Sequence, residues 1–121
     1  MTVGEAIRRL DSRAPNLYTD ADKKSWLKNH DMRVWNELIM THHGAPNTTL
    51  PDYDDNDTEL LIPAPYAEDV YNFYLQAMVA QENAEGDKYN ELATMYNRAY
   101  QEYCDHYNRT HMPLAFFRWR F

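Results

Sequence analysis

Apolar residues recur at steps of three and four along much of this chain, and the longest such pattern covers residues 86–108. On a helix this spacing places aromatic and small apolar side chains on one face and charged or amide side chains on the other. The apolar stripe comprises Tyr89, Leu92, Ala93, Tyr96, Ala99, Tyr100, Tyr103, Cys104 and Tyr107. The pattern predicts one long amphipathic helix whose apolar face is covered by another part of the chain.

A matching stripe precedes it, over residues 65–81. Its members are Tyr66, Val70, Phe73, Tyr74, Ala77 and Met78. Because only a short connection around residues 83–86 separates the two segments, we expect them to form an antiparallel helical hairpin. We expect this hairpin to be the core of the molecule, with Tyr96 as one of its buried rings and the remaining elements packed on it.

Two further helices are predicted before the hairpin. Thr2 and Glu5 have the spacing of a capping box, and a short apolar stripe then runs to about Arg13. Thr19 is the expected N-cap of a longer helix that ends near residue 41, with Gly44 after it. The apolar side of this longer helix comprises Trp26, Leu27, Val34, Trp35, Leu38, Ile39 and His42.

A linker of about twenty residues follows, and loops of that length usually have a function. Within it, Leu60, Leu61 and Ile62 should reach the core or form a short strand. The chain has only three glycines, few for a β-rich protein. We therefore expect an all-α fold: a small four-helix bundle built on a C-terminal antiparallel hairpin, with a long acidic loop between helices 2 and 3. Residues 1–111 would form this helical domain and residues 112–121 an extended C-terminal tail.

The net charge of −7 is unevenly distributed. Residues 52–69 contain seven acids and no base, whereas residues 109–121 contain three arginines and no acid. A nucleic-acid binder normally carries a basic stripe on a folded face, which this pattern does not provide. No apolar run of 18 residues occurs, so no membrane-spanning helix is expected, and no apolar segment typical of a signal peptide is visible.

The acidic loop is the first candidate site. Its acids are Asp52, Asp54, Asp55, Asp57 and Glu59. An EF-hand loop that began at Asp52 would need glycine at its sixth position and glutamate at its twelfth, and this chain has Asp57 and Pro63 there. We therefore interpret these residues as a solvated acidic loop without a metal, which keeps polyanions and other acidic surfaces away.

Other catalytic and metal-binding patterns are missing from the sequence. The five histidines form no HExxH pair, and no GxSxG, Walker A, GxGxxG or CxxC motif occurs. Cys104 lies on the apolar helix face and is expected to be a buried thiol. We predict no enzyme activity, no metal and no cofactor.

The C-terminal segment is the second candidate site. Pro113 should end the last helix near His111. Aromatic residues then alternate with arginines, the types enriched at binding hot spots. The predicted partner-binding residues are Phe116, Phe117, Arg118, Trp119, Arg120 and Phe121. The alternative is that this tail folds back on its own hairpin.

Several stretches resemble the head–tail adaptor (connector) proteins of long-tailed bacteriophages and prophages. They are Thr2-Val3-Gly4-Glu5-Ala6-Ile7, Tyr18-Thr19-Asp20, Val34-Trp35-Asn36-Glu37 with Thr41-His42, Asp57-Thr58-Glu59-Leu60-Leu61-Ile62-Pro63-Ala64-Pro65-Tyr66, and Tyr107-Asn108-Arg109-Thr110-His111-Met112-Pro113. The resemblance extends over nearly the whole chain, from residue 2 to residue 113, although none of these stretches is a chemical signature.

The resemblance implies a structural virion protein. Adaptors of this family form a ring, usually of twelve copies, beneath the portal protein after DNA packaging. They retain the DNA and provide the docking surface for a stopper or tail-completion protein. The resemblance thus implies a portal partner, self-association, assembly in the host cytoplasm and a place in the neck of the virion. DNA would pass through the lumen without specific binding, because carboxylates repel phosphates. The acidic loop with Asp52, Asp54, Asp55, Asp57 and Glu59 would then face the DNA channel or a neighbouring subunit.

Three other functions remain open from the sequence. The chain could be a small helical regulator that binds a host or phage protein. It could also be a DNA-binding module of the terminase small-subunit type, although its bases lie near one end of the second helix. An enzyme is the least favoured of the three.

Overall fold

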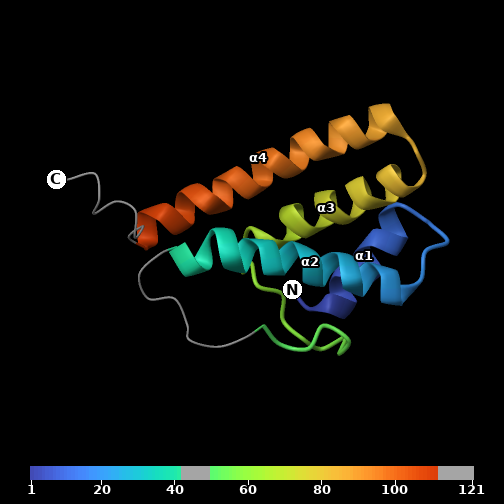
Figure 1. Ribbon diagram of the computed structural model, residues 1–121. Coiled ribbons are helices and arrows are strands. Elements are labelled where there is room, and N and C mark those ends of the chain that lie inside the picture. The colour runs from blue at the N-terminus through green and yellow to red at the C-terminus, as the bar shows by residue number, and fades with distance from the viewer. Residues whose placement is uncertain (42–49, 112–121) are drawn as a thin grey trace.

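The computed structural model of this protein describes residues 1–41 and 50–111, which are all-helical apart from loops and one isolated bridge (Figure 1). The elements are α1 (Val3–Arg13), α2 (Asp20–Glu37), a short 3₁₀ helix η1 (Ile39–Thr41), α3 (Ala67–Glu82) and α4 (Gly86–Thr110). In Figure 1, α4 lies along α3, and α1 and α2 lie on the other side of α3. The prediction of an all-α fold is confirmed for the described residues.

The predicted helix starts are confirmed by their caps. The Thr2 hydroxyl accepts a hydrogen bond from the Glu5 amide at 3.2 Å, and the Thr19 hydroxyl accepts one from the Asp22 amide at 3.2 Å. Each side chain satisfies an amide that has no partner within its helix. The predicted first stripe is also correct, since Val3, Ala6, Ile7 and Leu10 are all buried.

The predicted end of the second helix is wrong by about one turn. The regular helix ends at Glu37, and the chain continues as η1. The Thr41 hydroxyl donates to the carbonyls of Leu38 and Glu37, at 2.8 and 3.1 Å. These contacts favour a tightened 3₁₀ turn, because a threonine side chain offers late helical carbonyls an alternative partner.

The core is centred on α3 and not on α4, the helix with the most regular apolar stripe. α3 packs against α1, α2 and α4, and its buried residues surround the helix. They are Ala67, Val70, Tyr71, Asn72, Leu75, Ala77, Val79 and Ala80. Among the described residues of α4, only Ala99, Tyr103 and Tyr107 are buried, because this helix packs chiefly on α3. Tyr96 is half-buried, so the sequence prediction overstated its burial.

The C-terminal part of the long loop is attached to the start of α1. The amides of Val3 and Gly4 donate to the carbonyls of Thr58 and Asn56, both at 2.9 Å, and the Leu60 amide donates to the Met1 carbonyl at 2.9 Å. These bonds fix residues 56–60 beside the N-terminus. Leu60 and Ile62 enter the core, with exposures of 5% and 0%, as the sequence predicted, whereas Leu61 between them is half-buried.

Gly4 allows the loop to approach α1 closely. A Cβ atom at Gly4 would lie 3.2 Å from both the Cβ atom and the carbonyl oxygen of Asn56. Distances that short are tighter than ordinary carbon contacts. The loop therefore approaches α1 as closely as it does because this position lacks a side chain.

Candidate functional site

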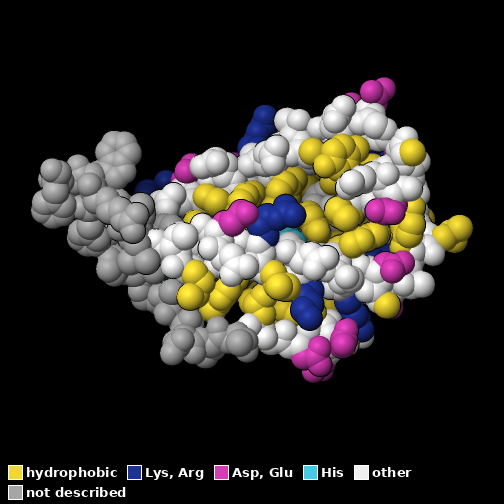
Figure 2. Space-filling view, viewed as in Figure 1, with side chains coloured by type: hydrophobic (Ala, Val, Ile, Leu, Met, Phe, Trp, Pro, Cys, Tyr) yellow, Lys and Arg dark blue, Asp and Glu magenta, His cyan; other side chains and the backbone are white. Residues whose placement is uncertain are grey.

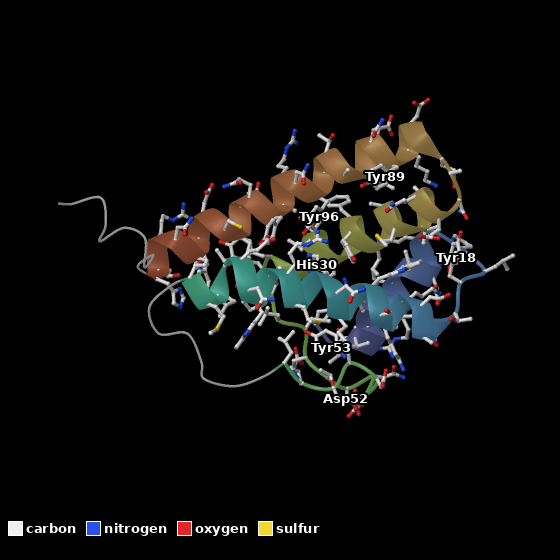
Figure 3. All side chains as sticks on the ribbon, viewed as in Figure 1. Tyr18, His30, Asp52, Tyr53, Tyr89 and Tyr96 are labelled. Carbon is white, nitrogen blue, oxygen red and sulfur yellow. The ribbon has the colours of Figure 1, made fainter. Side chains whose placement is uncertain are left out.

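The structure places all five predicted loop acids at the surface. Asp52 is labelled at the lower edge of the molecule in Figure 3. The Asp52 and Asp55 carboxylates accept hydrogen bonds from the Asp54 and Asp57 amides, each at 2.9 Å. Glu59 lies 3.2 Å from the N-terminal amine of Met1. The two aspartate contacts are local turn contacts, whereas the Glu59 contact joins the loop to the N-terminus. Within the described residues no three His, Cys, Asp or Glu side chains are grouped as a metal site would need.

Tyr53, in the same loop, points into the protein and not toward solvent. Tyr53 lies between two exposed acids but is itself buried, and its hydroxyl donates a hydrogen bond to Asp31 of α2. Burial raises the pKa of the Tyr53 hydroxyl well above its ordinary value, and the adjacent Asp31 carboxylate raises it further. The hydroxyl therefore remains a donor that ties the loop to α2.

Asp31 is the buried centre to which three parts of the chain are bonded. Its carboxylate is fully buried and accepts from the Tyr53 hydroxyl, from the Tyr71 hydroxyl at 2.7 Å and from the Leu61 amide at 3.0 Å. The Nδ1 atom of His30 lies 2.9 Å from the same carboxylate. A buried carboxylate requires this degree of hydrogen bonding to be tolerated. Asp31 thus joins α2, α3 and the loop at one point.

Sequence reasoning missed this centre. The signal was present, since His30 and Asp31 follow Leu27 by three and four residues and precede Val34 by four and three. That spacing puts both polar residues on the apolar side of α2. A polar pair at core positions indicates a hydrogen-bonded buried network, whose partners cannot be identified from spacing alone.

A hydrogen-bonded chain leads from Asp31 to the surface. The Nε2 atom of His30 lies 2.8 Å from the Tyr96 hydroxyl on α4, and Figure 3 shows these two residues between α2 and α4. The His30 ring is also in contact with Tyr71, Tyr74 and Tyr100, with ring centroids 4.6 to 6.3 Å apart. A single buried imidazole therefore links α2 to α3 and α4.

The order acid–imidazole–hydroxyl is found in nucleophilic enzymes, but this arrangement lacks their properties. The Asp31 carboxylate is shared among four donors instead of being directed at the imidazole. Burial raises the pKa of the Tyr96 hydroxyl well above its ordinary value, and the neighbouring Tyr74 raises it further. Tyr96 therefore stays protonated, and the chain of contacts is best explained as a structural link.

A groove opens beside Tyr96, with α3 as its floor and α2 and α4 as its walls. Its volume is about 480 Å³. Its lining residues include Trp26 and Arg33 from α2, Tyr74 and Met78 from α3, and Tyr89 and Tyr96 from α4. Figure 2 shows apolar side chains gathered on this face, with basic side chains among them. We refer to it as the α2–α4 groove, and it is large enough for a small ligand or the tip of a protein loop.

The second predicted site, the tail with Phe116, Phe117, Arg118, Trp119, Arg120 and Phe121, lies outside the described residues. His42 and Gly44 lie outside them as well. The predicted end of the last helix is confirmed, because α4 ends at Thr110 and His111 has an extended backbone. Cys104 is half-buried, and its burial raises the pKa of its thiol.

Comparisons of the chain with family models, with curated proteins and with solved structures found no match. None of the described helices is long and apolar enough to cross a membrane. The functional argument therefore rests on the residues and on their arrangement.

Proposed function

We propose that this chain is a head–tail adaptor subunit, a structural protein of the virion neck that forms a ring beneath the portal. In this proposal residues 1–111 are the adaptor domain of four helices and an acidic loop, and residues 112–121 are the segment that reaches the portal. The opposite side of the ring offers the docking surface for the stopper or tail-completion protein.

One observation carries the proposal. Two of the stretches that resemble adaptor proteins, residues 2–7 and 57–66, lie more than fifty positions apart but form one structural unit. Thr2 and Glu59 form a bridge, and the Val3 amide donates to the Thr58 carbonyl at 2.9 Å. Gly4 permits the close approach of Asn56. The two stretches that resemble adaptor proteins therefore contain residues that contact each other in the fold. Chance similarity would be scattered and would not be concentrated on contacting residues.

The charge distribution supports a role around DNA without binding to it. The four aspartates of the loop are exposed, and residues 52–69 contain no base. The one basic side chain bonded to this loop among the described residues is Lys24 of α2, which donates to the Asp54 carbonyl at 3.0 Å. A channel lined by carboxylates repels the phosphate backbone and lets DNA move.

Co-purification with the portal protein encoded in the same genome tests the proposal. We expect the full chain to join the portal as a ring visible by electron microscopy and to be a monomer or small oligomer alone, because acidic subunits repel one another. A variant that lacks residues 114–121 should melt like the full chain but fail to join the portal. If the full chain does not bind the portal and instead binds a host protein, the result would support the regulator function and refute the adaptor function.

The loop acids provide a second test. Replacing Asp52, Asp54, Asp55 and Asp57 by asparagine preserves the side-chain oxygens that accept the turn hydrogen bonds. We expect melting within a few degrees of the wild type, because exposed charges contribute little to stability. Particles that contain this variant should differ in DNA retention. Particles with unchanged retention would contradict a channel-facing position of the loop.

A further inference from the structure

The connection between α1 and α2 presents a leucine to solvent on a fixed loop. The exposure of Leu17 is 101%, although the residues on either side of it are held in place. The Asn16 side chain donates to the Ala14 carbonyl at 3.0 Å and accepts from the Tyr18 amide at 3.1 Å. The Tyr18 hydroxyl donates to the Asn83 side chain at 2.5 Å. Leu17 thus projects from a backbone that is already ordered, which lowers the entropic cost of docking.

The α2–α4 groove has the shape and polarity to receive such a projection. Its volume of about 480 Å³ exceeds what one leucine fills, so it also has room for the flanking loop. Its aromatic lining, from Trp26, Tyr74 and Tyr89, supplies the apolar surface that a leucine side chain prefers.

The charges of the two surfaces are complementary. Arg33 lines the groove, and within the described residues it makes no ion pair. Residues 14–22 contain two acids and no base. These acids, Asp20 and Asp22, are exposed and likewise make no ion pair in the described part of the chain. A contact that places the acids near Arg33 would pair charges that are unpaired within one copy.

From this juxtaposition we infer that the Leu17 loop of one copy docks in the α2–α4 groove of the next copy. The inference rests on the proposed ring and names the surfaces that would hold it together. The loop and the groove are neighbouring surfaces of one copy, since Tyr18 packs on Trp26 of the groove with ring centroids 5.6 Å apart. In the inferred contact each copy places its loop in one neighbour and receives the loop of another, so the contact is head-to-tail and can repeat from copy to copy until a ring closes.

Disulfide trapping tests this contact directly. Leu17 and Asn97, which is exposed and lines the groove on α4, are both replaced by cysteine in a Cys104→Ser background. The control pairs Leu17→Cys with Asn90→Cys, which replaces the same residue type at an exposed position of α4 outside the groove lining. Concentrated protein is oxidised and analysed by non-reducing electrophoresis. The contact is weak in the isolated chain, which is a monomer or small oligomer, and the disulfide traps each contact that forms at high concentration. We therefore expect the Leu17/Asn97 variant to form a ladder of trimers and larger species, and the control to stop at chance dimers.

Two substitutions measure the contributions of shape and charge. Leu17→Ala should weaken self-association in sedimentation experiments about tenfold, because one apolar side chain is no longer buried. Arg33→Glu should also weaken it, and Asp20→Arg with Asp22→Arg in the same chain should restore it. Leu17 and Arg33 are exposed, so wild-type melting is expected for Leu17→Ala and Arg33→Glu and serves as the check on folding. Asp20 and Asp22 lie in the first turn of α2, where the helix dipole favours acids, so the two arginines should lower the melting temperature by a few degrees without unfolding the protein.

The outcomes separate this inference from the proposed function. A Leu17/Asn97 ladder no longer than that of the control, or products that stop at a dimer, would overturn the docking contact. A portal that still acquires a ring of the Leu17→Ala variant with unchanged affinity would overturn it as well, while leaving the adaptor function intact. A ladder from a chain that does not join the portal would support the contact and refute the adaptor.

Discussion

At the scale of single residues, Asp31 is the most consequential position in the chain. It lies on α2 with no exposed surface and receives hydrogen bonds from the loop, from α3 and from its neighbour His30. Such a network specifies one arrangement of its elements, because every alternative packing leaves buried polar groups without partners.

Removal of the Asp31 carboxylate should therefore destabilise the fold strongly. We expect Asp31→Ala to lower the free energy of unfolding by about 3–5 kcal/mol, since it leaves two tyrosine hydroxyls and the Leu61 amide without their acceptor. Urea denaturation measures the loss. Asp54→Ala, at an exposed position, serves as the control and should change stability by no more than about 0.5 kcal/mol. A loss below about 1 kcal/mol for Asp31→Ala would show that the network is not a structural centre.

At the scale of elements, the starts of α1 and α2 could be predicted because they depend on local chemistry: the Thr2 and Thr19 hydroxyls bond to amides three residues ahead. The position of the core around α3 could not be predicted from the sequence. The stripe on α4 is the most regular in the sequence, but a stripe shows only which face is apolar and not how completely a neighbour covers it. The buried α3 is apolar on several faces and therefore has a weak pattern.

The candidate site, too, could be predicted from the sequence only in part. The exposed loop acids could be found from composition, whereas the inward direction of Tyr53 and its bond to Asp31 depend on tertiary contacts between α2 and the loop. The α2–α4 groove could not be predicted either, because its walls are set by how far α4 lies from α2.

The junction of the loop with α1 gives a prediction at this scale. Gly4→Ala gains up to about 1 kcal/mol of helix propensity but brings a methyl group within 3.2 Å of Asn56, and overpacking of this kind costs roughly 1–3 kcal/mol. We expect a net loss of about 1 kcal/mol in denaturant unfolding. Gly86→Ala, where a Cβ meets nothing within 4 Å, is the matched control and should be neutral or stabilising. Equal effects of the two substitutions on stability would show that the loop makes no close steric contact with α1 at Gly4.

At the scale of the whole molecule, stability is sensitive to alkaline pH because burial raises the pKa of seven of the ten tyrosines. Burial raises the pKa of Tyr74 to about 12 against the ordinary value of 10.0, and burial together with Tyr107 raises that of Tyr103 to about 12. A tyrosine with a raised pKa in the folded state favours folding fully below pH 10. That contribution is lost as the pH rises through about 12, because the unfolded chain releases its protons first.

We therefore expect helix content and tyrosinate absorbance to change together in one transition between about pH 10 and 12. Tyr74→Phe removes one of these groups and should make the fall of stability with pH shallower in this range. Ionisation of all ten tyrosines with intact helices would contradict the buried arrangement of the rings.

The adaptor role is tested most directly by electron microscopy of particles made without this chain. If the chain is a head–tail adaptor, deletion of its gene should yield heads that package DNA but carry no tails and lose their DNA, together with free tails. Supplying the chain again should restore tailed particles. Normal tailed particles in its absence would contradict the account.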